Sequence, residues 1–275
     1  MNKTLYISDL DGTLLNKSAE LSEQTANALN EMIDKGMNFS VATARTLATT
    51  GKILAELALR IPIILMNGVL IYDIEQQCYV QINALPPETV TAIVTSLKTL
   101  AVTGVMYELK DNVLMTYYET LEQKPLRDFV EERMTRYNKA FSQTDSFSAV
   151  SPEHIIYFSL LDTLERLQPV RDALMQLPGL NLTLYRDVYS TDQWFLEMFN
   201  ASASKRNAVS YLREAYGFDR IVGFGDNYND LPLFAACDVR VAVENANPEV
   251  KAAADYICGA HYDDDVVKWL AENAL

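Results

Sequence analysis

Apolar residues recur along the chain in two patterns, and these patterns alternate near both ends of the sequence. Short apolar runs that are typical of buried strands lie at residues 5–7, 38–42, 62–66, 221–224 and 239–243. Apolar residues spaced three or four apart, as on one face of a helix, lie at residues 22–36, 47–57, 204–217 and 266–270. Strands alternating with helices predict a Rossmann-like α/β core with a mostly parallel sheet and crossover helices.

The middle of the chain has a different rhythm. Helical patterns at 87–100, 126–137 and 163–177 are separated by pairs of short strands, and Lys110-Asp111-Asn112 connects one pair as a hairpin turn. This order is typical of an α+β module inserted into the first fold, with borders near Ile82 and Gln193. We therefore expect a core formed by residues 1–81 and 194–275, and an inserted domain formed by residues 82–193.

A dense polar cluster follows the first strand. Asp9 and Asp11 stand one residue apart, so they leave the strand end on the same side, and Gly12-Thr13 then allows a sharp turn. Two carboxylates this close repel each other unless a cation or a shared proton offsets their charge. Mg²⁺ prefers oxygen ligands and suits such a pair.

Three further polar clusters stand next to predicted strands or helix starts. Thr43 follows the second strand, Lys205 stands at the start of a helix, and Asp226, Asn229 and Asp230 follow the strand at residues 221–224. Ligands of open parallel sheets bind beyond the carboxyl ends of the strands, so all four clusters are expected at one edge.

Each cluster alone has an ordinary structural interpretation. An isolated Asp-x-Asp is usually an acidic turn, and Thr43 alone reads as a helix N-cap. Lys205 alone reads as a solvated cation, although the helix dipole disfavours a positive charge at that end. The residues taken singly leave these alternatives open, and their joint occurrence favours a phosphate and metal site.

The four clusters resemble, in order, the motifs of the haloacid dehalogenase superfamily. Asp9-Leu10-Asp11-Gly12-Thr13 resembles motif I, Ala42-Thr43-Ala44-Arg45 motif II, Lys205 motif III, and Gly225-Asp226-Asn227-Tyr228-Asn229-Asp230 motif IV. Ala44 stands where related sequences usually have glycine, and it keeps the backbone donor. An insertion between motifs II and III is similar to the type IIB, Cof-like sugar phosphatases, in which it forms a C2-type cap domain.

The resemblance implies a Mg²⁺-dependent phosphatase that acts on phosphate monoesters of small metabolites, sugar phosphates first. By this resemblance, Asp9 of this chain would be the nucleophile that forms an aspartyl-phosphate, and Asp11 would be the general acid and base. The implied phosphate ligands are Thr43, the Ala44 amide, Lys205 and Asn229; the implied metal ligands are Asp9, the Asp11 carbonyl and Asp226, with Asp230 acting through the metal's waters. A phosphomutase or phosphotransferase, or more distantly a non-catalytic sugar-phosphate binder, stays an alternative.

Composition restricts the partners. The chain has 275 residues, 49% of them apolar, and a formal net charge of −14. Such an acidic protein is not expected to bind nucleic acid or an anionic membrane, and an anionic substrate requires locally placed cations. Three widely spaced cysteines indicate free thiols in a reducing compartment, and Met1-Asn2-Lys3-Thr4 leads directly into the first strand. We therefore expect a cytoplasmic protein and leave its oligomeric state open.

Overall fold

The structure, a computed structural model, describes residues 3–187, 192–259 and 264–274. The chain divides into two compact units, one formed by residues 1–81 and 203–275 and the other by residues 82–202. The first border agrees with the expected one. The second lies nine residues later than expected, because β11 (Trp194–Asn200) pairs with β9 (Ile155–Asp162) and β10 (Leu180–Arg186), both within the inserted unit.

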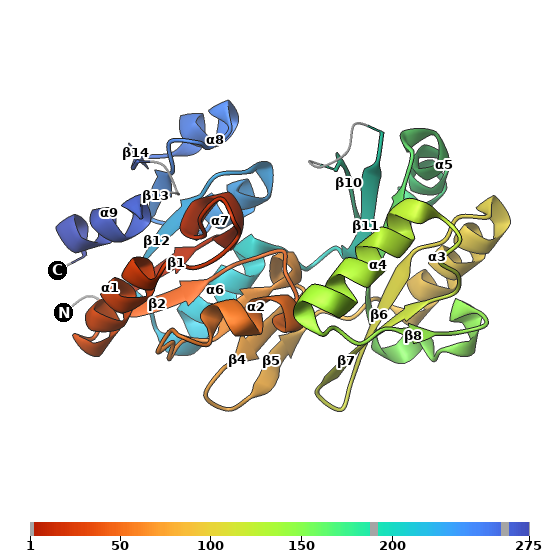
Figure 1. The fold of residues 1–275 in the computed structure, drawn as a ribbon, viewed down its shortest axis with the longest axis horizontal. Helices are drawn as coiled ribbons and strands as arrows, with labels where there is room; N and C mark the ends of the chain where they lie inside the picture. Colours follow the sequence, from red (N-terminus) through yellow and green to blue (C-terminus); the bar gives the residue numbers. More distant parts are fainter. Residues whose placement is uncertain (1–2, 188–191, 260–263, 275) are drawn as a thin grey trace. The chain divides into compact units, whose positions relative to one another are not determined.

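The core unit contains a five-stranded sheet in which neighbouring strands run parallel (Figure 1). The order is β14-β13-β12-β1-β2, so the first strand of the chain lies between strands from both ends of the sequence. Ser8 is in register with Val41 on one side and with Phe224 on the other, which aligns the carboxyl ends of three strands. The strands are β1 (Thr4–Ser8), β2 (Asn38–Val41), β12 (Arg220–Gly225), β13 (Val239–Ala242) and β14 (Tyr256–Ile257).

Serine side chains mark the points at which two helices of the core unit begin. Ser22 accepts a hydrogen bond from the Thr25 amide and so begins the first helix, and Ser204 does the same for the Asn207 amide. These contacts satisfy amides that have no partner inside the helix. The helices of this unit are α1 (Glu23–Asp34), α2 (Leu47–Leu54), α6 (Lys205–Tyr216), α7 (Leu231–Phe234), α8 (Pro248–Ala253) and α9 (Asp265–Asn273).

The apolar run at residues 62–66 does not belong to the parallel sheet, which corrects the sequence prediction. It forms β3 (Ile63–Leu65), which pairs antiparallel with β4 (Leu70–Asp73) in a separate sheet completed by β5 (Cys78–Ile82). A single parallel bridge between Ala42 and Ile64 connects this hairpin to the end of β2. The chain reverses at Asn67 and Gly68, whose φ angles are 54° and 96°.

The inserted unit is an α+β domain, as expected. Its six-stranded sheet has the order β10-β11-β9-β6-β7-β8, and its pairs are antiparallel except for β7 with β8. One sheet face packs with α3 and α5 into an apolar core. The other strands and the helices of this unit are β6 (Val105–Lys110), β7 (Val113–Tyr118), β8 (Ser142–Gln143), α3 (Pro87–Leu100), α4 (Lys124–Tyr137) and α5 (Leu164–Leu174).

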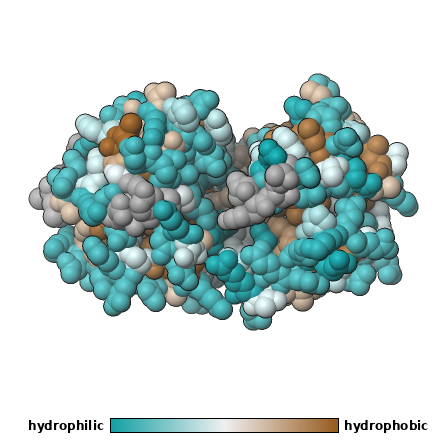
Figure 2. Space-filling model, turned by 45° about the horizontal axis from the view of Figure 1, so that its top comes forward, coloured by the Kyte–Doolittle hydropathy of each residue, from teal (hydrophilic) through white to brown (hydrophobic). Residues whose placement is uncertain are grey.

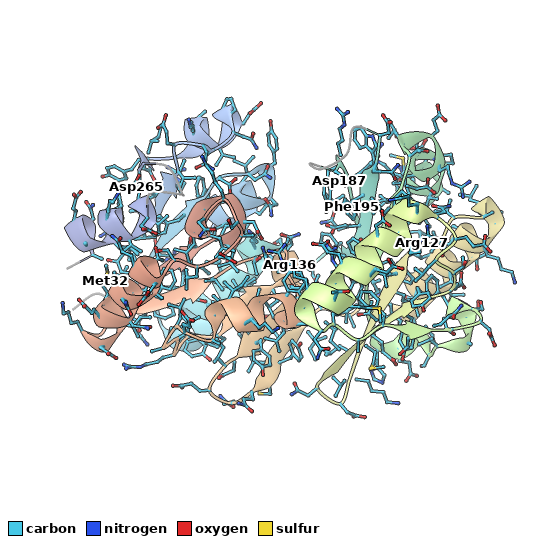
Figure 3. All side chains as sticks on the ribbon, viewed as in Figure 1. Met32, Arg127, Arg136, Asp187, Phe195 and Asp265 are labelled. Carbon is cyan, nitrogen blue, oxygen red and sulfur yellow. The ribbon has the colours of Figure 1, made fainter. Side chains whose placement is uncertain are left out.

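Alternation along β11 separates the two faces of this sheet. Leu196 and Met198 belong to the apolar core, so Phe195, Glu197 and Phe199 point to the opposite face. Phe195, labelled in Figure 3, meets the ring of Phe129 from α4 at 5.8 Å between centroids. The second face is therefore covered in part by α4 and carries polar and aromatic side chains.

Hydrophilic side chains predominate on the visible face of each unit, with apolar side chains in small groups (Figure 2). This distribution agrees with the strongly acidic composition. None of the helices in the described residues combines the length and the apolar character that crossing a membrane requires.

Candidate active site

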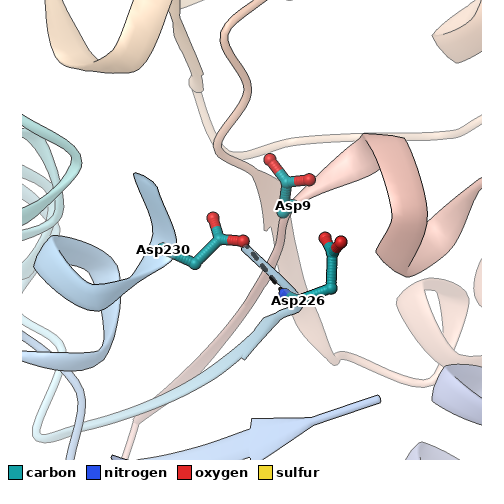
Figure 4. A group of neighbouring side chains, drawn as sticks. All are labelled: Asp9, Asp226 and Asp230. Atoms are coloured by element: carbon teal, nitrogen blue, oxygen red, sulfur yellow. Dashed lines mark hydrogen bonds between the residues drawn. The ribbon is translucent and has the colours of Figure 1, made fainter. Parts of the chain in front are cut away.

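Three of the predicted carboxylates meet at the carboxyl ends of β1 and β12. Asp9, Asp226 and Asp230 each offer an oxygen, and these oxygens all lie within 4.8 Å of one another (Figure 4). Asp9 is buried and its amide donates to the Phe224 carbonyl at 3.0 Å, so the two strand ends are joined at the site. Residues more than 200 positions apart are thus brought to one edge of the sheet, as predicted.

The turn after Asp9 is shaped to approach Asp226. Gly12 has a φ of +80°, and a Cβ at this position would lie 2.5 Å from Asp226 Oδ2. A side chain is therefore excluded for both conformational and steric reasons. The Thr13 hydroxyl donates to Asp226 Oδ1 at 2.8 Å, and Asn245 Nδ2 donates to the Gly12 carbonyl at 2.8 Å.

Lys205 is the cation of the cluster. Its Nζ lies 2.5 Å from Asp9 Oδ1 and 2.6 Å from Asp230 Oδ1, and the side chain is only 1% exposed. The solvated alternative is therefore wrong. Burial alone would lower the pKa of Lys205, but the carboxylates of Asp230 and Asp9 outweigh burial and raise it, so the amine stays charged.

Asp230 holds the loop that follows β12. Its Oδ2 accepts from the backbone N–H groups of Asp226 and Asn227 at 3.0 and 3.1 Å, while Oδ1 accepts from Lys205. The carboxylate is completely buried, and each oxygen has a partner. Asp230 therefore positions Asp226 and Lys205 at the same time.

The negative charges of neighbouring carboxylates raise the pKa values of Asp9 and Asp226. Burial raises the pKa of Asp9 well above its ordinary range, the Asp230 charge raises it further, and Lys205 opposes both. Burial, followed by the Asp230 charge, raises the pKa of Asp226 to about 6. A divalent cation would relieve this excess of buried negative charge, and an all-oxygen group at this spacing fits Mg²⁺.

Thr43, Ala44 and Asn229 lie near the same strand ends. Thr43 is buried and accepts from the Arg45 amide at 3.1 Å, whereas the residue that precedes α2 as its N-cap is Thr46. Asn67 connects Thr43 with Asn229: the backbone N–H of Asn67 donates to the Thr43 carbonyl at 3.0 Å. The connection continues to the exposed Asn229, whose Nδ2 donates to Asn67 Oδ1 at 3.3 Å. Their binding of phosphate stays a prediction.

Asp11 differs from the other predicted acids. Its carboxylate is 50% exposed and lies outside the three-carboxylate group found among the described residues. Arg45 holds both of its oxygens, with Nε 2.7 Å from Oδ2 and Nη2 2.5 Å from Oδ1. The sequence analysis assigned no role to Arg45, Asn67 or Asn245, and of these only Arg45 stands within one of the four motifs.

Comparison with known proteins gives one consistent family. The model of the haloacid dehalogenase-like hydrolases matches residues 6–270. The pyridoxal phosphate phosphatase YbhA of Escherichia coli (strain K12) is 22% identical over 273 residues, covering 97% of each chain. The 5-amino-6-(5-phospho-D-ribitylamino)uracil phosphatase YwtE of Bacillus subtilis (strain 168) is 25% identical and covers 95% of each.

Solved structures agree with this assignment. A haloacid dehalogenase-like hydrolase from Bacteroides thetaiotaomicron superposes with a TM-score of 0.82 at 25% identity, covering 98% of this chain and 99% of the other. The family model matches nearly the whole sequence, and this match establishes the family of the chain. The chain belongs to the haloacid dehalogenase-like hydrolase family.

Proposed function

We propose that this protein is a Mg²⁺-dependent phosphatase that hydrolyses phosphate monoesters of small metabolites through an aspartyl-phosphate on Asp9. The observation that carries the proposal is the position of Lys205, whose charged amine bridges Asp9 and Asp230 beside Asp226. Asp9, Asp226 and the Asp11 carbonyl would hold the metal, and Asp230 would act through its waters. When bound, Mg²⁺ would offset the carboxylate charge and stabilise negative charge on the phosphoryl group.

The proposed reaction has two steps. A carboxylate oxygen of Asp9 attacks phosphorus, the bond to the leaving oxygen breaks, and Asp11 gives that oxygen a proton. Asp11 then takes a proton from the water that attacks the aspartyl-phosphate, which releases phosphate and regenerates Asp9. The exposure of Asp11 fits a group that must reach both leaving group and water.

Four groups would hold the phosphoryl oxygens. Lys205 supplies the charge, and the Thr43 hydroxyl, the Ala44 amide and the Asn229 amide group supply hydrogen bonds. No described residue accepts a hydrogen bond from the Ala44 N–H, so this donor is available. Several donors are needed because phosphate-monoester hydrolysis is so slow that enzymes accelerate it by up to ~10²¹.

The substrate proposed is a small phosphorylated metabolite, with sugar phosphates first and phosphorylated cofactors next. Support comes from the relatives, one named for pyridoxal phosphate and another for a phosphoribitylamino uracil. Both are small molecules that carry a single phosphate monoester.

The experiment measures phosphate release from a panel of sugar phosphates, pyridoxal phosphate and a generic aryl phosphate, with Mg²⁺ and with chelator. We expect release that chelator and Asp9→Asn both abolish. Asp34→Asn is the control, because Asp34 is exposed and pairs only with Arg60 in its described contacts. Release that persists in Asp9→Asn, or phosphate found on another sugar instead of in solution, would contradict the proposal.

A further inference from the structure

A second group of chemically active side chains lies in the inserted domain, and the proposed reaction does not use it. Lys139 follows the end of α4, where its amide donates to the Arg133 carbonyl at 3.2 Å. The residue is only 6% exposed. The Nζ lies 4.4 Å from the centroid of the Tyr107 ring and 5.0 Å from that of Phe141.

The amine of Lys139 lacks a counter-charge. No described residue accepts a hydrogen bond from Nζ or forms an ion pair with it. Burial, followed by the nearby positive charge of Arg133, lowers its pKa to about 7. A charged amine in a residue that is only 6% exposed, with no partner among the described residues, is unfavourable, so an anion that pairs with it would be stabilising.

The acid on the same sheet face does not serve as that partner. Glu197 of β11 accepts hydrogen bonds from the hydroxyl groups of Tyr157 and Tyr185. Burial raises the pKa of Glu197, and neither Lys139 nor Arg133 contributes to its shift. Glu197 therefore bonds to the two tyrosines and does not pair with the amine, although its charge, like that of Arg133, acts on Tyr107.

Two further donors adjoin Lys139. The Arg133 guanidinium stacks on the Phe129 ring, with Cζ 3.5 Å from the centroid, and its hydrogen bonds to described residues both leave from Nη1. Its remaining nitrogen edge is free to donate. Tyr107 is 5% exposed, and its hydroxyl has no hydrogen-bond partner among the described residues.

We propose that Lys139, Arg133 and Tyr107 form an anion-binding subsite of the inserted domain, which accepts a carboxylate or phosphate group of a small ligand. Two cations and a phenolic donor lie close together here. Glu132 pairs with Nη1 of Arg133 at 3.2 Å, whereas no described acid pairs with Lys139. An anion there would satisfy the buried amine and remove the repulsion between the two cations. This inference does not depend on the chemistry proposed for Asp9.

The experiment observes Lys139 directly in the full chain. Protein labelled with ¹³Cε-lysine is titrated by NMR, and the Lys139 resonance is assigned by its disappearance in Lys139→Met. Inorganic phosphate and malonate are the probes, with sodium chloride at matched ionic strength as the control for screening. We expect either probe to raise the Lys139 pKa by about one unit or more, while the exposed Lys98 and Lys110 stay unchanged.

Variants test the other two members. Arg133→Gln and Tyr107→Phe should each weaken the anion-induced shift, with Arg133→Gln lowering the anion affinity about ten-fold or more. Thermal unfolding confirms that each variant is folded. A response to malonate alone or to phosphate alone identifies the group that binds. A Lys139 pKa that neither probe changes relative to chloride would overturn the proposal, whatever the outcome for phosphate release.

Discussion

The guanidinium of Arg45 holds both carboxylate oxygens of Asp11, through Nε at 2.7 Å and Nη2 at 2.5 Å. Arg45 is largely buried, whereas Asp11 is half-exposed. A planar two-point contact of this kind fixes the orientation of the acid as well as its position. The proposed general acid and base is thus oriented by a residue from the second polar cluster.

Replacing Arg45 should therefore impair catalysis through Asp11. We expect Arg45→Met to lower kcat on an aryl phosphate by about ten- to a hundred-fold, because Asp11 loses its fixed orientation. Arg45→Lys should recover only part of the loss, since an amine cannot hold both oxygens in one plane. Arg60→Met, which removes an exposed pair with Asp34, should leave kcat unchanged. Equal kcat in Arg45→Met and wild type would exclude this positioning role.

Lys205 should contribute strongly to stability. Lys205→Met leaves the buried Asp9 and Asp230 without their cation, and removing one partner of such a group costs about 3–5 kcal/mol. The measurement is the free energy of unfolding in urea, at neutral pH without metal. Lys124→Met serves as the comparison, because the Lys124–Asp128 pair is exposed and should change stability by at most about 0.5 kcal/mol. A loss no larger than this in Lys205→Met would argue against a tightly paired cation.

Gly68 allows the close approach of the segment that begins α6. A Cβ at Gly68 would lie 2.2 Å from the Ser204 carbonyl oxygen and 3.0 Å from the Lys205 nitrogen, at a φ of +96°. Gly68→Ala should destabilise the protein by about 2 kcal/mol or more and should displace Lys205, which would also lower activity. Gly51→Ala in α2 meets no atom within 4 Å and should stabilise by about 0.5–1 kcal/mol. Urea unfolding of the two variants decides between these opposite signs.

Mg²⁺ should bind to the folded state through Asp226. A ligand that binds only the folded state stabilises it by about 2.7 kcal/mol at a hundred times its Kd, so Tm should rise with Mg²⁺ and fall with chelator. Asp226→Asn should remove most of this Mg²⁺-dependent shift, whereas Asp34→Asn should keep it. Thermal unfolding across a Mg²⁺ series gives the result, and an unchanged shift in Asp226→Asn would place the cation elsewhere.

The sequence was informative where chemistry depends on residues next to a strand end. Asp9, Asp226 and Asp230 could be assigned to one site because parallel strands bring their carboxyl ends to one edge, and Lys205, which begins α6, was assigned to it by the order of the motifs. The hydrogen bond from Thr13 to Asp226 could not be predicted. It joins residues far apart in the chain and depends on side-chain rotamers, which the spacing of apolar residues does not determine.

Strand pairing marks the second limit of the sequence prediction. The apolar run at β3 was predicted as a strand of the parallel sheet, and the residues of β11 were assigned to the core, but an apolar run does not specify its neighbour. β3 turns back at Asn67 into a hairpin, and β11 joins the inserted sheet, which moves the border from residue 194 to residue 203. Lys139 was missed for a similar reason, because its burial results from tertiary packing against Tyr107 and not from its local sequence.

Lys139 should make stability depend on pH above neutrality. Its pKa is about 7 when folded and about 10.4 when unfolded, so the unfolded chain binds more protons between these values. Wild-type stability should therefore rise with pH across this window relative to Lys139→Met, by at most about 1.4 kcal/mol per pH unit. Below pH 7 the full cost of burying the charge remains, and Lys139→Met should be the more stable protein. Urea unfolding of both proteins at pH 7 and pH 9, in chloride without phosphate or carboxylates, measures the change. A difference between the two proteins that is the same at both pH values would show that Lys139 keeps its ordinary pKa.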